Sequence, residues 1–322
     1  MHHRDEIVSF GSFDREITRL TTMLESLGVP VDSSSDLKAQ GYAAFSTLYY
    51  SVFSDERPAM DRWEEVQAGG ALAGLGDLAS KINRAVDSGG FEAIRPHLAK
   101  MVTGSVRMNA SSRVTDEAAN KNSELYVGCL ALGSGMAVDL EDPKASAGGT
   151  NPDVLLTHGG TEWSIAVKAS HSSKGPTIFG NVQKAVQQIE RSERNGVVFI
   201  NVKNILEHEA MARSGAFSST SEATSAVGAA VDGVVREVRS SIVDQDWRDL
   251  FDGKRARPLI AFMGQVTVSA MVPMIGPMFV PVKVMRVLTV PPAPTDPTAL
   301  TGLDAGAWQL LDALNEELQR NP

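Results

Sequence analysis

Two short segments place a carboxylate and an ammonium group on neighbouring predicted strands. Asp153 opens one strand after Asn151-Pro152, and Lys168 ends the next strand after Ile165-Ala166-Val167. Carboxylate oxygens are the ligands that a hard ion such as Mg²⁺ prefers, and a lysine can orient a water molecule or stabilise negative charge. Such a pair is suited to the hydrolysis of a phosphodiester, in which the ion polarises a phosphoryl oxygen and lowers the pKa of the attacking water.

The elements around these residues follow a regular order. Thr115, followed by two acidic residues, marks a helix start, because its oxygen can cap free amide groups while the acids complement the helix dipole. His158-Gly159-Gly160 is a natural hairpin connection between two strands. The predicted elements are a helix to about Leu132, strands Met136 to Leu140, Pro152 to Thr157 and Glu162 to Ala169, a helix Val182 to Arg191 and a strand Val197 to Val202.

This order of helix, three strands, helix and strand, with its Pro-Asp step and its terminal lysine, resembles the core of the PD-(D/E)XK superfamily of nucleases and restriction-type enzymes. The resemblance extends from about Thr115 to Ser269 and implies an α/β fold, with a central mixed sheet flanked by helices. It also implies magnesium held by a carboxylate on the first helix, the Asp of the Pro-Asp step and an acid two residues before the lysine. Those positions, with the lysine, are Glu124, Asp153, Ala166 and Lys168.

Position 166 departs from the family pattern because it carries an alanine, whose methyl group cannot bind magnesium. Glu162 shares the strand face of Lys168, but it lies about 13 Å along the strand from position 166 at roughly 3.3 Å per residue. Glu190, on the following helix, and Glu141, at the end of the neighbouring strand, are better replacements. If the site is otherwise preserved, Ala166→Glu is expected to restore the ligand and tighten magnesium binding; a relocated Glu190 would instead be crowded by the added charge.

Two glutamines on the second helix are further candidates. Gln183 and Gln187 lie one turn apart, and family members often direct a glutamine from this helix into the site. The resemblance therefore implies such a role for Gln183, with a solvated helix surface as the alternative, which is favoured for Gln187. For Asp153 alone the alternative is a turn residue after proline, and for Glu124 it is an exposed helix residue.

The resemblance implies a metal-dependent nuclease that uses Mg²⁺ or Mn²⁺ to hydrolyse nucleic acid, with DNA as the favoured substrate and restriction or defence as the setting. Lys168 would act as the catalytic base or charge stabiliser. The alternative is a catalytically inactive nuclease fold that binds nucleic acid or a protein partner, which Ala166 favours. With 39 acidic against 30 basic residues and a net charge of −9, the composition argues against a protein that coats nucleic acid by bulk electrostatics.

Outside this core the pattern predicts three regions: a helical amino-terminal region at 1–110, a nuclease-like core at 111–295 and a carboxy-terminal helix at 296–322. The glycine-rich segment Gly74 to Ala79 mimics a dinucleotide-binding loop, but no buried strand precedes it, so that function is rejected. The polar amino terminus lacks an apolar signal segment, which favours a cytoplasmic protein. The single cysteine, Cys129, cannot form an internal disulfide. The Ser-rich stretch Ser214 to Ser225 is expected to be a loop.

The segment Pro258 to Val282 carries no charged side chain and is long enough to cross a bilayer. Its prolines and glycines would break a helix, so it predicts a strand, an apolar loop and a strand, with no membrane partner. Within it, Met271 to Pro281 is an apolar stretch rich in methionine, which we expect to form a homodimer contact. Burial against the protein's own helices is the alternative.

Overall fold

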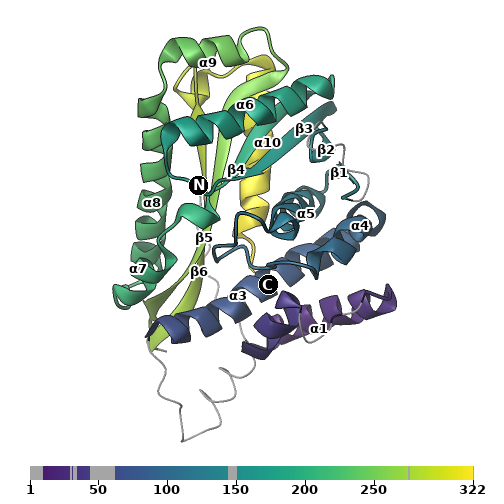
Figure 1. The fold of residues 1–322 in the computed structure, drawn as a ribbon, viewed down its shortest axis with the longest axis vertical. Helices are drawn as coiled ribbons and strands as arrows, with labels where there is room; N and C mark the ends of the chain where they lie inside the picture. Colours follow the sequence, from purple (N-terminus) through teal and green to yellow (C-terminus); the bar gives the residue numbers. More distant parts are fainter. Residues whose placement is uncertain are drawn as a thin grey trace, which may run out of the picture.

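The structure, a computed structural model, describes residues 10–29, 31, 35–43, 62–143, 151–274 and 276–321. Within these residues the strands form a mixed six-stranded sheet whose spatial order follows the chain (Figure 1). The first three strands are antiparallel, the fourth and fifth run parallel to the third, and the sixth returns antiparallel to the fifth. The strands are β1 (Ala137–Leu140), β2 (Val154–His158), β3 (Thr161–Ala169), β4 (Asn195–Asn201), β5 (Ala256–Val272) and β6 (Gly276–Thr289).

Helices cover both faces of this sheet, which makes the protein an α/β fold (Figure 1). Successive strand residues point to opposite faces, so Ile165 and Val167 pack into one apolar cluster and Ala166 packs into another. The first cluster includes residues of α3 (Arg62–Asp87), α5 (Glu117–Gly133) and α10 (Gly302–Gln319), together with residues of α1 (Phe10–Ser26) and α4 (Phe91–Met101). The second cluster includes residues of α6 (Gly175–Arg191), α8 (Thr220–Ser241) and α9 (Asp244–Phe251).

An amino-terminal helical region precedes the sheet, as predicted. α1 (Phe10–Ser26) packs on α3, and α4 (Phe91–Met101) packs on α5. α3 also contacts β5 and β6, and a side chain at Gly69 would collide with the ring of Phe279, so glycine permits this close approach. The segment Gly74 to Ala79 lies inside α3, which confirms the rejection of a dinucleotide loop. Residues 1–9, 30, 32–34 and 44–61 of the predicted region lie outside the described residues, and its boundary at residue 110 stays a prediction.

The predicted core elements are confirmed with shifts at their ends. The N-cap of α5 is Asp116 rather than Thr115, because the Asp116 carboxylate accepts a hydrogen bond from the amide of Ala119 at 2.8 Å. α6 starts seven residues before the predicted Val182, at Gly175. The predicted loop Ser214 to Ser225 is wrong from Thr220 onward, where Ser219 caps the start of α8.

The uncharged segment near the carboxy terminus forms a long hairpin. β5 extends to Val272 and β6 starts at Gly276, so the predicted apolar loop is mostly paired strand, with Ala270 opposite Met278. Ile275 lies outside the described residues. No helix in the described part of the chain has the length and apolar character needed to cross a bilayer. The short elements are η1 (Lys203–Ile205), α7 (His208–Arg213) and η2 (Pro297–Ala299).

Candidate functional site

Asp153 and Lys168, predicted as the centre of the site, lie in contact. The Nζ of Lys168 is 3.3 Å from Oδ2 of Asp153, and the same oxygen accepts a hydrogen bond from the amide of Val167 at 2.7 Å. The pairing of β2 with β3 explains the contact, because Val154 stands opposite Ile165 and the amide of Asp153 donates to the Ile165 carbonyl. Asp153 is therefore held beside the end of β3.

Glu124 reaches the same place from α5. Its side chain is buried, and its charge is close enough to Asp153 to perturb that carboxyl group. Burial is the main cause that raises the pKa of Asp153 to about 7, and repulsion by Glu124 adds to it. Lys168, the Val167 amide and Lys121 act in the opposite direction. The two lysines therefore offset only part of the effect of burial and repulsion on Asp153.

Glu141 also lies beside Glu124 and Asp153, and the three carboxylates form an acidic cluster. Its amide donates to the carbonyl of Asp153 at 3.2 Å, so the pairing of β1 with β2 continues one residue past β1 and brings Glu141 beside the site. Its side chain is buried, and its Oε2 lies 3.7 Å from the Nζ of Lys121. Of the two acids expected to replace a ligand at position 166, the structure thus brings Glu141 to the site.

Glu190 is not brought to the site. Its Oε1 accepts hydrogen bonds from the amides of Arg255 and Ala256, at 2.7 and 3.0 Å. Ala256 pairs with the start of β4 at Gly196, whereas Lys168 pairs with Ile200. Four residues of strand correspond to about 13 Å. The predicted role of Glu190 as a metal ligand is therefore not supported by its position.

Gln183, the glutamine predicted to enter the site, lies elsewhere, and Gln187 lies on the helix surface, as the sequence favoured. Gln183 is exposed and lines a shallow pocket between α6 and α9, and Gln187 is exposed as well. Gln188 is the buried glutamine of this helix. Its Nε2 donates a hydrogen bond at 2.8 Å to the carbonyl of Asn151, which lies two residues before Asp153 in the chain. Its place between Ala185 and Ile189 on the apolar stripe of α6 was the sequence signal that could have identified it.

Ala166 is fully buried in the apolar cluster beneath α6 and α8. A carboxylate there would enter apolar surroundings, while Lys168 turns its ammonium toward Asp153 and the Val167 carbonyl. Glu162 is exposed and pairs with Arg194 at 3.3 Å, as expected for a residue remote from the site. Position 166 thus supplies no metal ligand, and neither does Glu162, the acidic residue of the same strand β3.

Lys121 and His97 complete the cluster, and sequence reasoning missed both. Lys121, one turn before Glu124 on α5, donates to its Oε2 at 2.7 Å. His97, on α4, is 1% exposed, and its Nε2 lies 3.7 Å from the same oxygen. The spacing of Lys121 and Glu124 was a detectable signal, whereas His97 depends on how α4 packs against α5.

A divalent ion fits the chemistry of Glu124 and Asp153. Both offer buried carboxylate oxygens, and the raised pKa of Asp153 indicates that added positive charge would be stabilising. As the side chains stand, no group of three or more His, Cys, Asp or Glu residues in the described ranges is arranged to hold a metal ion. Glu124 and Asp153 are therefore the two residues that could hold an ion, with Glu141 nearby.

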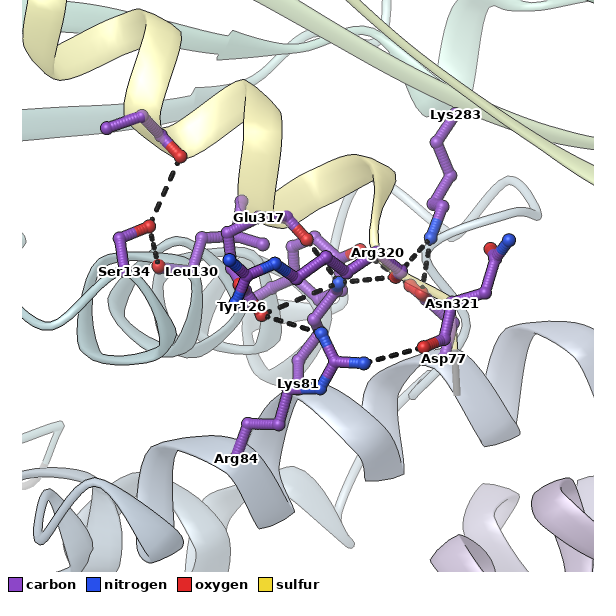
Figure 2. A network of polar contacts seen from close by, with 11 residues as sticks. Asp77, Lys81, Arg84, Tyr126, Leu130, Ser134, Lys283, Glu317, Arg320 and Asn321 are labelled. Carbon is purple, nitrogen blue, oxygen red and sulfur yellow. Dashed lines mark hydrogen bonds and ion pairs between the residues drawn. The ribbon is translucent and has the colours of Figure 1, made fainter. Parts of the chain in front are cut away.

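A second polar network lies on the far side of α5 (Figure 2). Tyr126, two positions after Glu124 and so nearly opposite it on the helix, donates to Asp77 of α3 at 2.5 Å. Lys283 of β6 donates to the other oxygen of Asp77 at 2.8 Å. Lys81 donates to the main-chain carbonyls of Glu317 and Arg320 at the end of α10. These contacts join α3, α5, β6 and α10 through buried side chains, which indicates a structural role.

Comparisons of the chain with protein-family models, with curated proteins and with solved structures found no match.

Proposed function

We propose that this chain is a metal-dependent nuclease of the PD-(D/E)XK type, which hydrolyses phosphodiester bonds of nucleic acid, with DNA as the favoured substrate. The observation that carries the proposal is the contact of Asp153 with Lys168 at 3.3 Å, with Glu124 beside them. The element order also supports it, since α5, three antiparallel strands, α6 and a parallel strand follow the order implied by the resemblance.

Glu124 and Asp153 would hold Mg²⁺ or Mn²⁺, which when bound supplies a polarised phosphoryl oxygen and an acidified water. The amide of Val167 fixes Oδ2 of Asp153, so this carboxylate is positioned before any substrate arrives. The side chain of Lys168 is 21% exposed, and its ammonium can orient water or stabilise negative charge on the phosphate. The burial of the two carboxylates limits their contact with bulk water and strengthens their electrostatic interactions.

The second candidate is a protein of the same fold that binds nucleic acid or a protein partner without cleavage. It is favoured by the methyl group at position 166 and by Lys121, which already neutralises part of the acidic charge. Restriction or defence as the setting, and the cytoplasm as the location, stay predictions.

The test is incubation of DNA and RNA with the protein in Mg²⁺ or Mn²⁺, beside Asp153→Asn, Lys168→Met and Glu162→Gln. Glu162 is the matched control, because it lies on the strand of Lys168 but is exposed and remote from the site. We expect cleavage by wild type and Glu162→Gln, with a loss of at least about 100-fold in the other two variants. Cleavage that persists in both site variants would reject the nuclease assignment.

Binding without cleavage would favour the second candidate. Binding to phosphates should then weaken steeply as salt rises, because neutralised phosphates release counterions. A flat salt response would remove phosphate recognition and leave a protein partner.

A further inference from the structure

We propose that Lys121 is a built-in counter-ion of the acidic cluster: it holds Glu124 and Glu141 while no metal is bound and is displaced when a divalent ion binds. Lys121 is thus a positioning residue, and the proposal rests on the metal site of the proposed function. Its basis is the placement of one ammonium group between carboxylates from α5 and the end of β1.

The contacts of Lys121 are those expected of a cation that balances the cluster. Its Nζ is 2.7 Å from Oε2 of Glu124 and 3.7 Å from Oε2 of Glu141, and it also interacts electrostatically with Asp153. The three carboxylates come from different elements and are all largely buried. Without a cation between them, their mutual repulsion would oppose the packing of α5 against β1 and β2.

His97 provides a second observation that points to a ligand. It is 1% exposed, and neither ring nitrogen has a hydrogen-bond partner among the described residues. Its Nε2 faces Oε2 of Glu124 at 3.7 Å, which is too long for a hydrogen bond. Buried polar atoms are nearly always satisfied, so this unmet capacity indicates that the cluster is completed when a ligand enters or its side chains rearrange.

The ammonium of Lys121 and a divalent ion would compete for one carboxylate of the cluster. Both would need the carboxylate of Glu124, and their like charges would repel at a separation of a few ångströms. Lys121 is able to leave, because its side chain is 16% exposed and carries its charge on a flexible four-carbon stem. Removing its charge should therefore favour the ion.

The first experiment is calorimetric titration of Ca²⁺ and of Mn²⁺ into the protein without nucleic acid, for wild type, Lys121→Met, Lys121→Gln and Lys184→Met. Lys184, exposed on α6, is the matched control. We expect the dissociation constant for the metal ion to fall at least about tenfold in the two Lys121 variants. Even with the dielectric constant of water, removing the repulsion between an ammonium and a divalent ion a few ångströms apart corresponds to a change of about that size. The control should match wild type. Unchanged or weaker binding in the Lys121 variants would overturn the proposal.

The second experiment uses the wild-type chain, so it does not depend on whether a variant folds. Lysines are acetylated with and without Mn²⁺ and the modified positions are measured by mass spectrometry. Displacement predicts faster acetylation of Lys121 in Mn²⁺, with Lys184 unchanged. Slower or unchanged labelling of Lys121 would reject displacement.

The two ideas fail separately. Tighter ion binding in Lys121→Met with no cleavage of DNA or RNA by wild type would retain the counter-ion and reject the nuclease. Cleavage by wild type with unaltered ion binding in Lys121→Met would do the reverse.

Discussion

The substitution Ala166→Glu distinguishes the family pattern from the structure of this chain. The resemblance implies that a carboxylate at position 166 restores a magnesium ligand. In the structure Ala166 has no exposed surface and packs among apolar side chains such as Ile178 and Val182 of α6. The added carboxylate would enter this cluster, and Lys168, its nearest cation along the strand, already contacts Asp153.

The expected result is destabilisation. A buried carboxylate without a partner costs about 3–5 kcal/mol. Extra side-chain volume in a packed core adds about 1–3 kcal/mol. Ala166→Gln has nearly the same size without the charge, so the difference between the two variants isolates the electrostatic part. Burial would raise the folded-state pKa of the new glutamate, so this difference should vanish below its unfolded pKa of about 4.3 and grow as pH rises.

Urea unfolding at pH 4 and pH 7 measures both variants, and calorimetry with Mn²⁺ measures whether Ala166→Glu gains a ligand. A glutamate variant as stable as wild type at pH 7, with tighter ion binding, would refute the reasoning. It would mean that position 166 opens toward Asp153 and not toward α6.

Glu141→Gln should weaken Mn²⁺ binding, whereas Glu190→Gln should leave it unchanged; calorimetry that gives the opposite order would restore Glu190 as the ligand. Burial is the main cause that lowers the pKa of Lys81 to about 7, so the unfolded chain binds more protons between about pH 7 and 10 and this lysine makes stability rise with pH there. Lys81→Met should flatten that rise between pH 7 and 9.5 in urea unfolding, and an unaltered slope would contradict it. If the hairpin forms a homodimer, light scattering should show a dimer that Met271→Asp with Met274→Asp dissociates without unfolding, since both side chains are exposed; a monomeric wild type would end the idea.

The substitutions in the hairpin are placed at Met271 and Met274 because both side chains are exposed in the structure. Phe279, which lies in the same apolar stretch, packs against Gly69 of α3. An aspartate at position 279 would therefore disturb the fold itself. Met271 and Met274 test the surface alone.

The core of the fold was predictable because its signals are local. A capped helix, a glycine hairpin and an apolar strand each require only a few neighbouring residues, and their order placed Asp153 beside Lys168. The start of α6 at Gly175 was not predicted, because the helical spacing of apolar residues becomes clear only from Val182 onward. The Ser-rich stretch was misjudged because Ser219 acts as a helix cap and not as a flexible residue.

The rest of the site depends on packing between distant segments. Alternation placed position 166 on one face of β3, but only the docked helices show that this face is apolar at that point. The sequence favoured Glu190 over Glu141 as a metal ligand, and the pairing of β1 with β2 reverses that order. His97 meets Glu124 through the contact of α4 with α5, for which no short motif exists.

The attachment of α10 to α3 has a consequence for how the chain folds during synthesis. Lys81 emerges from the ribosome early, but its acceptors are the carbonyls of Glu317 and Arg320, more than 230 residues later. Until those residues are synthesised, Lys81 on α3 lacks its hydrogen-bond acceptors, and the apolar face of α3 lacks α10 to pack against. The packing of α3 should therefore be completed only after α10 is synthesised, so we expect a nascent chain lacking α10 to remain sensitive to proteases within α3.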